Sequence, residues 1–413
     1  MKSQPNPIKI HKLKSGLILI LEQMPHLRSV AYDLLIPGGI VNDPAQNIGA
    51  SHILAELTSR GVVGLSGREL SESFDQLGIR HSESASQTRF SYRGALLAEQ
   101  VESALRLVAK MVREPTFPEE QIQNIRSSLM QEIDSLKDNP ARWAFSELSQ
   151  RYYPGPYARA SLGEKSGIEA TDRGVVEALW KATFHPKGSI LSLAGNLEFD
   201  TTIALVEELF EGWGGEGIEL PPFGELPQPE RYHLHHDSAQ QQIVLCYPSA
   251  KFLEELYYEA KVSNALLAGG MFGRLFLEVR EKRGLCYSVY SKHSANRFYG
   301  TVFGYAGTTP ERAHETLSVM GEVFSGLADN IEEAELARAK RNLLASMVMA
   351  EESSGARAVS NATDWWLAGR IRTLEEIESA INKVNIDGIA SYVKQFPHSR
   401  YTLLTVGPRD ITV

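Results

Sequence analysis

Residues 49–61, GASHILAELTSRG, are the stretch on which the interpretation of the whole chain depends. Its apolar residues recur at helical spacing, and its last glycine is a typical helix stop. His52 and Glu56 are four residues apart, so an imidazole and a carboxylate project from the same face of this predicted helix. Both groups can bind a metal, but a lone histidine on a helix is more often a core or surface residue. The stretch alone does not assign a function.

Composition sets the broad class. The chain has 413 residues, 43% hydrophobic and 23% charged, which is ordinary for a folded protein of two or three domains. A net charge of -9 argues against a nucleic-acid partner. Two cysteines, Cys246 and Cys286, are too few for a disulfide framework or a cysteine zinc site.

Residues 16–21, GLILIL, form the most apolar run near the start, and Glu22 follows directly. The run is too short for a signal peptide core or a membrane span, so it predicts a strand. We therefore expect no membrane association and a cytoplasmic location.

Strand and helix patterns are mixed along the chain. Residues 8–36 alternate in the manner of two strands, with a turn at Ser15 and Gly16, and residues 85–96 and 187–197 also have strand character. Helical patterns cover residues 49–61, 67–78, 99–112, 119–137, 141–152 and 201–210. This mixture predicts an α+β fold, with mixed and mostly antiparallel sheets packed against helices.

The chain is predicted to consist of two similar halves. Residues 216–230 hold four prolines and few core-forming residues, which is typical of an extended linker. This places one domain at residues 1–215 and another at residues 231–413. The helical patterns at 118–136 and 331–349 align with each other, so the halves are interpreted as a duplicated domain.

The stretch 49–61 resembles the zinc-binding helix of the pitrilysin/insulinase family of metallopeptidases, whose motif is Gly-x-Ala-His-Phe-Leu-Glu-His. His52 matches the first histidine, and Arg60 with Gly61 matches the basic-glycine end of the motif. The general base of the family falls on Ala55, and the second histidine falls on Glu56. The resemblance also implies a pair of similar domains in one subunit.

The motif is therefore degenerate at two of three chemical positions. Alanine has no proton acceptor, so Ala55 cannot act as a base. The third zinc ligand of the family corresponds to Glu132, in the segment MQEIDSLKDNP. A metal set of His52, Glu56 and Glu132 is a weak alternative, since one imidazole with carboxylates can bind zinc. We expect no metal and no cofactor in this chain.

A second motif is intact. Residues 275–291, LFLEVREKRGLCYSVYS, closely resemble the most characteristic segment of the C-terminal domain in this family. There an arginine and a tyrosine, here Arg280 and Tyr287, reach across to the zinc site. A guanidinium can grip a substrate carbonyl, and a phenol can donate a hydrogen bond to an oxyanion. Without the resemblance, Arg280 would be part of a charged helix face and Tyr287 a core residue of a strand.

Residues 266–276, LLAGGMFGRLF, resemble a glycine-containing segment of the same family. Backbone amides of Gly269 and Gly270 are candidates for contact with a peptide substrate. Tight backbone packing is an equally good explanation for these glycines and for Gly273. Nucleotide binding is disfavoured because no Lys-Ser/Thr pair of a phosphate loop follows the glycines.

Two further segments attract attention without predicting a site. HLHHD, residues 233–237, places His233 and His235 on one strand face, but no second ligand cluster lies nearby in sequence. DWWLAG, residues 364–369, is an aromatic pair on a helix and fits a core or subunit interface.

These patterns together predict a non-catalytic subunit of a heteromeric zinc metallopeptidase. Arg280 and Tyr287 would act in trans on the zinc site of a homologous partner that has the intact His-x-x-Glu-His motif, and an extended peptide would be the substrate. Zinc would then belong to the partner, and the chain alone would be inactive. Two alternatives remain: a self-sufficient metallopeptidase with the His/Glu/Glu site, and a purely structural protein like the core subunits of the respiratory cytochrome complex.

Overall fold

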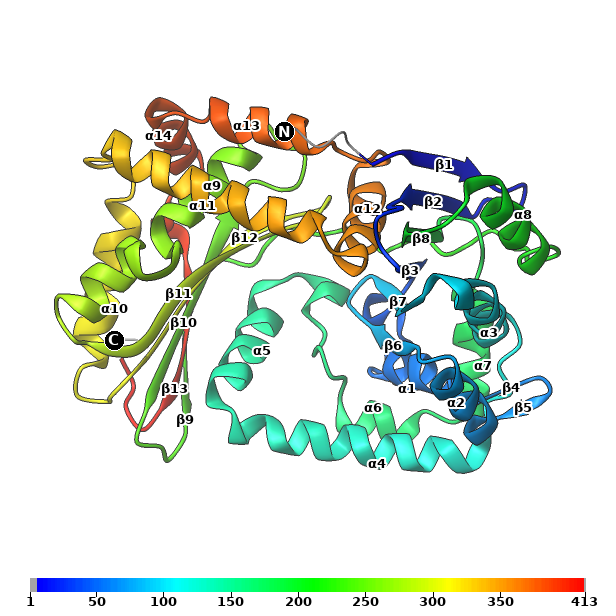
Figure 1. Ribbon diagram of the computed structural model, residues 1–413. Coiled ribbons are helices and arrows are strands. Elements are labelled where there is room, and N and C mark those ends of the chain that lie inside the picture. Colours follow the sequence, from blue (N-terminus) through cyan, green and yellow to red (C-terminus); the bar gives the residue numbers. More distant parts are fainter. Residues whose placement is uncertain (1–5, 412–413) are drawn as a thin grey trace. The chain divides into compact units, whose positions relative to one another are not determined.

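The computed structural model describes residues 6–411 and contains two compact units (Figure 1). Unit 1 comprises the residues up to Ser135, then Gly155–Pro222 and Ala350–Gly369. Unit 2 comprises Leu136–Pro154, Phe223–Met349 and the residues from Arg370 onward.

Unit 1 is built on a six-stranded sheet. The strand order is β1 (Ile8–Lys12), β2 (Ile18–Gln23), β8 (Ile190–Gly195), β3 (Ser29–Pro37), β7 (Arg89–Leu97) and β6 (Arg80–Ala85). Only the pairing of β2 with β8 is parallel among the pairings of this sheet. The predicted turn between the first strands is confirmed, and Gly16 adopts a φ of 98° there, which favours glycine.

The two faces of this sheet have different partners. Tyr32 and Leu34 on one face join the main core, which includes Ile53 and Leu54. Ala31 on the other face packs with residues of α12. The helices of unit 1 are α1 (Ala50–Leu57), α2 (Gly67–Gln76), α3 (Val101–Arg113), α4 (Glu119–Ser135), α6 (Lys165–Ala170), α7 (Arg173–Thr183), α8 (Phe199–Leu209) and α12 (Ser354–Ala368).

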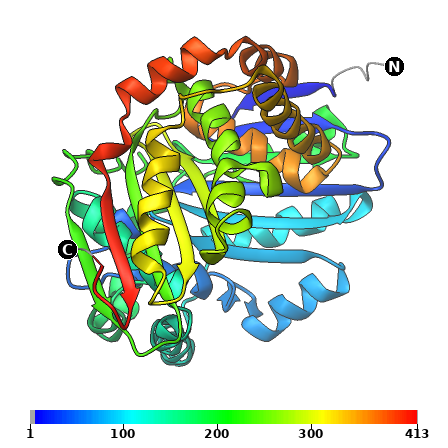
Figure 2. The same ribbon diagram turned by 90° about the vertical axis from the view of Figure 1, so that its left-hand side faces the viewer.

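Unit 2 is built on a five-stranded sheet with the order β11 (Cys286–Ala295), β12 (Gly300–Thr308), β10 (Gln241–Ser249), β13 (Thr402–Gly407) and β9 (Arg231–His235). Its helices are α5 (Pro140–Tyr152), α9 (Tyr257–Ala268), α10 (Ala313–Ser325), α11 (Glu333–Glu351), α13 (Leu374–Lys383) and α14 (Ile386–Gln395), with a π-helix at Phe276–Glu281. Figure 2 shows α10, in yellow, lying along this sheet, where Met320 and Phe324 join the core with Leu245.

The two sheets share one plan, which confirms the predicted α+β fold and its two similar halves. Each has an antiparallel hairpin at one edge (β6–β7 and β11–β12) and a parallel pair toward the other (β2–β8 and β9–β13). This arrangement gives both sheets the same connectivity and places at one side of each an edge strand, β6 or β11, that pairs with only one neighbouring strand among the described residues.

The boundaries of the units differ from continuous domains in two places. Helix α5 packs on β10 and β13 of unit 2, although it lies before the linker in sequence. Helix α12 packs on β8 and β3 of unit 1, although it lies after the linker. An amphipathic pattern predicts which helix face is buried but not which sheet covers it. Residues 216–230 contain no helix or strand, and the chain changes unit there.

Several expected elements are confirmed, and others were not expected. The predicted helices at 67–78, 119–137, 141–152 and 201–210 correspond to α2, α4, α5 and α8. Strand β6 and helices α6 and α7 were not predicted. RHSESA in β6 has no apolar alternation because this edge strand exposes every second residue and buries none fully. Within residues 6–411, no helix is both long and apolar enough to cross a membrane.

Candidate functional site

Helix α1, which carries the degenerate motif, is held at its start by the buried side chain of Asp43. Its carboxylate accepts hydrogen bonds from the backbone N–H of Gly49 at 2.7 Å and of Ser51 at 2.9 Å. Burial raises the pKa of Asp43, although the hydrogen bonds from Ser51 and Gly49 oppose that shift. Gly49 has a φ of 113°, and a Cβ there would lie 2.7 Å from Ile168. The start of α1 is therefore held in a fixed position by Asp43 and by the close packing of Gly49.

His52 and Glu56 each interact with another residue of this chain, and Ala55 is buried. His52 donates through Nε2 to the carbonyl of Ser161 at 2.7 Å, and Glu56 forms an ion pair with Arg60. Ala55 is 3% exposed, so a methyl group fills the position of the base. The arrangement offers neither a free imidazole nitrogen at Nε2 of His52 nor a proton acceptor at position 55.

The residues present do not fit a zinc ion. Glu132, the predicted third ligand, lies on α4, and no group of three His, Cys, Asp or Glu able to hold a metal occurs in the described part of the chain. The structure therefore does not assemble His52, Glu56 and Glu132 into a metal site.

A polar network links α1 to the edge strand β6. Ser59 donates to Glu83 at 2.6 Å, and His81 contacts Glu83 at 3.2 Å through Nε2. The other nitrogen of His81 shares a hydrogen bond with the hydroxyl of Tyr32 at 2.8 Å. Burial opposes ionisation of Glu83, but hydrogen bonds from His81 and Ser59 keep its pKa lowered. Sequence reasoning missed this network because β6 itself was not predicted.

Arg280 and Tyr287 lie next to each other in unit 2. The guanidinium carbon of Arg280 is 5.7 Å from the ring centre of Tyr287 and 5.1 Å from that of Phe276. Both separations are in the range of cation–π contacts. Tyr287 is 81% exposed, so the alternative interpretation as a core residue of a strand is wrong and the side chain is accessible.

Two irregularities of the backbone, a π-helix and a β-bulge, determine the positions of Arg280 and Tyr287. Arg280 lies on the π-helix Phe276–Glu281, a rare geometry that is frequent at functional sites. Tyr287 is the extra residue of a β-bulge, because Cys286 pairs with Thr308 and Ser288 already pairs with Gly307. A bulge interrupts the alternation of side chains between the two faces of a strand and changes the direction of one side chain. Cys286 therefore points inward, and burial raises its pKa to about 11.

The glycine segment combines packing with exposure. A Cβ on Gly269 would lie 2.4 Å from the carbonyl of Ala265, and one on Gly273 would lie 2.8 Å from backbone atoms. Gly270 has a φ of 73° and open space around it. Met271 and Phe272 are 69% and 59% exposed. Tight packing thus accounts for Gly269 and Gly273, while Gly270 allows a turn that exposes two apolar side chains.

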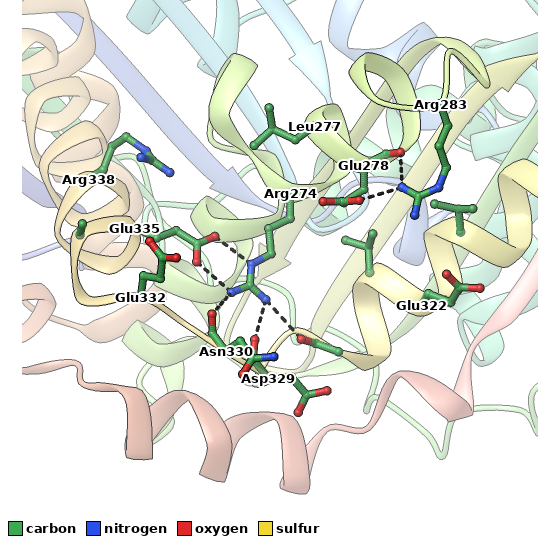
Figure 3. A pocket seen from close by; sticks show the side chains of 14 residues that line it. Arg274, Leu277, Glu278, Arg283, Glu322, Asp329, Asn330, Glu332, Glu335 and Arg338 are labelled. Atoms are coloured by element: carbon green, nitrogen blue, oxygen red, sulfur yellow. Dashed lines mark hydrogen bonds and ion pairs between the residues drawn. The ribbon is translucent and has the colours of Figure 1, made fainter.

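Arg274 anchors the start of the helical segment that carries Arg280 (Figure 3). Its guanidinium donates twice to Glu335, at 2.8 Å each, and also to carbonyls of the loop after α10, including Gly326 and Leu327 at 3.2 and 3.1 Å. A cavity of about 500 Å³ lies beside it, lined also by Leu277 and Glu278. Arg274 is therefore a positioning residue for the Arg280 segment.

The two other segments singled out from sequence have structural roles. His233 shares a hydrogen bond with Thr405 at 2.9 Å, and His235 contacts Asp237 at 3.1 Å. Trp366 is buried, 9% exposed, on α12. Each of these side chains is thus accounted for by a contact or by burial within the chain.

Family models match both halves of the chain. A model described as "Insulinase (Peptidase family M16)" matches residues 18–165, and one described as "Peptidase M16 inactive domain" matches residues 171–343. The chain is 28% identical over 407 residues to "Uncharacterized zinc protease YmxG" from Bacillus subtilis, covering 97% of this chain and 98% of that one. It is 25% identical to an "Uncharacterized zinc protease" from Rickettsia felis, with 97% and 98% covered.

Solved structures share the fold. A crystal structure of a peptidase M16 inactive domain from Pseudomonas fluorescens superposes with a TM-score of 0.89 at 22% identity, covering 98% of both chains. A protease from Helicobacter pylori superposes with a TM-score of 0.88 at 18% identity, covering 97% of this chain and 99% of that one.

Proposed function

The chain belongs to the insulinase-type M16 peptidase family, and from this premise we propose that it is the non-catalytic subunit of a two-chain zinc peptidase. The observation that supports the proposal most is the contrast between its two motifs. Ala55 and the engaged His52 leave no catalytic group on α1, whereas Arg280 and Tyr287 form an accessible pair. The active-site residues that this chain retains are useful only to another subunit.

In this proposal the partner is a homologous subunit with the intact His-x-x-Glu-His motif, and the zinc belongs to that partner. Arg280 supplies a fixed positive charge that grips a carbonyl or carboxylate of the peptide. Tyr287 supplies a hydroxyl donor for the oxyanion that develops on the scissile carbonyl. Because these groups contact substrate rather than metal, the chain contributes to binding and turnover without a metal of its own.

The substrate we propose is an extended peptide. Strand β11 begins at Cys286, immediately before Tyr287, and it is an edge strand of the sheet in unit 2. A sheet edge offers unpaired backbone groups to which an extended segment can add as a further strand. Gly270, in its open turn, is the glycine of the neighbouring segment that remains a candidate for backbone contact.

The test is reconstitution with a zinc-bearing homologous subunit and an unstructured peptide. We expect no cleavage by this chain alone and strongly increased cleavage when the two chains are mixed. Full activity of the partner alone, unchanged by adding this chain, would leave the purely structural alternative ahead.

The names of two relatives, both called zinc protease, support a second candidate function, that of a self-sufficient peptidase. A self-sufficient peptidase would cleave the peptide without any partner and would lose activity to a chelator. The degenerate α1 disfavours this function, and the reconstitution experiment distinguishes the two.

A further inference from the structure

Two arginines and one aspartate lie on one face of the sheet in unit 1, the face opposite the main core. Arg89 and Arg93 are four residues apart on β7, so their side chains leave the strand on the same side. Phe90 and Tyr92, which alternate with them, belong to the main core. Asp33 of β3 is the Cα partner of Arg93 in the register of these two strands. The three charged groups therefore project from two neighbouring strands on the same side of the sheet.

The carboxylate of Asp33 is already paired with one of the two arginines. Nε of Arg93 lies 3.2 Å from Oδ2 of Asp33, and the side chain of Asp33 is fully buried. Burial raises the pKa of Asp33, and the charge of Arg93 opposes that shift. Arg93 itself is 41% exposed, so the part of its guanidinium that does not face Asp33 can reach a ligand. Asp33 neutralises Arg93 and holds it against the sheet, and the charge of Arg89 is left to be balanced by another group.

Arg89 is mostly buried, yet its side chain has no hydrogen bond, ion pair or aromatic contact with any residue from 6 to 411. Burial lowers the pKa of Arg89, the charge of Asp33 opposes this shift, and the charge of Arg93 adds to it. Arginine is rarely buried unless it is paired, because taking an unpaired charge out of water is costly. A mostly buried guanidinium without a partner therefore indicates a missing anion.

The surroundings of the two guanidinium groups suit a small planar anion. The charge of Arg93 influences that of Arg89, so the two groups lie within electrostatic range of each other. Ser91 lies between them on the same side of β7, and its Cα partner on β6 is the exposed Ser84. Arginine presents N–H groups in a planar fork that matches the two oxygens of a carboxylate. One unbalanced positive charge on this face also matches the single negative charge of a carboxylate.

We propose that Arg89 and Arg93 form a binding site for a carboxylate, with Asp33 as the residue that positions Arg93. Arg89 donates its N–H fork to the two carboxylate oxygens, and the exposed part of Arg93 donates to one of them. The bound carboxylate and Asp33 together balance the charges of both arginines. The carboxylate belongs either to an acidic side chain of a peptide or to a free organic acid. The proposal does not depend on the peptidase function.

The experiment is isothermal titration calorimetry of the full chain at constant ionic strength with two short peptides. Both are blocked at their ends and otherwise neutral; one contains a single glutamate, and the other contains glutamine at that position. We expect the wild type to bind the glutamate peptide at least about tenfold more tightly, because charge-assisted hydrogen bonds are the stronger ones. Arg89→Met keeps the aliphatic part of the side chain and should bind both peptides equally. Arg28→Met, at an exposed arginine just before β3, is the matched control and should keep the preference.

Two binding results would overturn the proposal: equal affinity of the wild type for the two peptides, or a preserved preference in Arg89→Met. Thermal unfolding without ligand separates a binding site from a structural arginine. Arg89→Met removes an unpaired charge and should melt no lower than the wild type. A large loss of stability would show that Arg89 is a structural partner of Asp33 and would also overturn the proposal. Arg93→Met is a poor test, because it leaves Asp33 buried without its cation.

Glutarate distinguishes the two sources of the carboxylate. If it displaces the glutamate peptide at a concentration similar to that of the peptide itself, the carboxylate alone is recognised and a free organic acid is the ligand. If the peptide binds and glutarate does not displace it, the ligand is an acidic side chain of a peptide. Either result supports a carboxylate site at Arg89 and Arg93.

Discussion

Arg357 on α12 donates to both carboxylate oxygens of Glu22 on β2, at 3.0 and 2.8 Å, across 335 residues of sequence. Glu22 is 1% exposed, and Asn361 also donates to it at 2.6 Å. The segment of α12 within unit 1 is therefore fixed to the first hairpin by a fully satisfied buried carboxylate. This contact explains why the late helix belongs to the early sheet.

The variant Arg357→Leu leaves Glu22 buried with an uncompensated charge. Breaking a buried pair by removing one partner typically costs about 3 kcal/mol or more, and we expect that loss in the free energy of unfolding. Urea denaturation measures it. Arg370→Leu removes an arginine from an exposed pair with Glu376 and should cost less than about 1 kcal/mol. Equal losses in both variants would contradict the importance of burial.

Arg274→Met should also destabilise the chain. The side chains of Arg274 and Glu335 are 18% and 16% exposed, so the variant leaves Glu335 nearly buried and the loop carbonyls without their donor. We expect a loss of about 3 kcal/mol in urea denaturation. Arg68→Met, from an arginine that is 88% exposed, is the control and should be nearly neutral. An unchanged midpoint for Arg274→Met would show that Arg274 does not anchor the segment.

Tyr287→Phe tests the proposed role in trans. The variant removes only a hydroxyl from an exposed ring, so folding and assembly should be unaffected. If the hydroxyl is a donor to the developing oxyanion, turnover by the reconstituted complex should fall by about a hundredfold. Steady-state kinetics with the zinc-bearing partner measure this effect.

Arg280→Ala should instead weaken peptide binding. The guanidinium can hold substrate before as well as during reaction, so the apparent KM should rise more than kcat falls. Tyr290→Phe, at a partly exposed tyrosine on the same strand as Tyr287, is the matched control for Tyr287→Phe. It also removes one phenol hydroxyl, and it should keep wild-type kinetics. Wild-type kinetics in both Tyr287→Phe and Arg280→Ala complexes would refute the model.

The zinc prediction concerns the chain alone and a repaired motif. We expect elemental analysis of the wild type to find no stoichiometric zinc. The double variant Ala55→Glu, Glu56→His restores the family motif on α1, but it places a carboxylate at a position that is 3% exposed. The apo variant should therefore be less stable than the wild type, and zinc should restore part of the loss. A wild type with about one zinc and chelator-sensitive cleavage would contradict the proposed function.

His398 should make the chain sensitive to mild acid. Its ring lies flat against Phe324 and Tyr401, and burial lowers its pKa to about 4 from 6.5. Between these values the unfolded state binds a proton and the folded state does not, so stability falls as the pH drops from about 6.5 toward 4. At pH 5 the loss is roughly 2 kcal/mol relative to pH 7.

The variant His398→Phe keeps an aromatic ring in the same position and removes the proton. We expect a smaller loss of stability between pH 7 and pH 5 than in the wild type, measured by urea denaturation at both values. The exposed His235 provides the control variant His235→Gln, which should keep the wild-type pH dependence. Identical pH dependence in all three proteins would contradict the low pKa of His398.

Local patterns in the sequence were sufficient for much of the fold. The turn at Gly16 and the helices α2 and α4 follow from residue spacing and helix-stop signals, which act within one element. The placement of α5 and α12 depends on which sheet covers each helix. That is decided by contacts such as Arg357 with Glu22, and these are invisible in local periodicity.

Some features of the candidate site could likewise be predicted from the sequence, and others could not. The residue types at Ala55 and Glu56 already indicate a missing base and ligand, and the structure adds that His52 is bound to Ser161. The exposure of Tyr287 could not be predicted, because alternation places every second strand residue inward and a bulge breaks that rule. Asp43 was missed because its partners are backbone groups at the start of α1.

The placement of α12 has a consequence for synthesis. The ribosome releases the N-terminus first, so the strands of unit 1 are complete once β8 has emerged, but one face of their sheet awaits a helix that ends at Ala368. At ordinary translation speeds that interval is roughly 10 to 35 s. During it Ala31, Ala194 and the carboxylate of Glu22 lack their cover. The nascent chain therefore has a prolonged vulnerable period, in which protection by a chaperone matters more than it would for two domains that fold in succession.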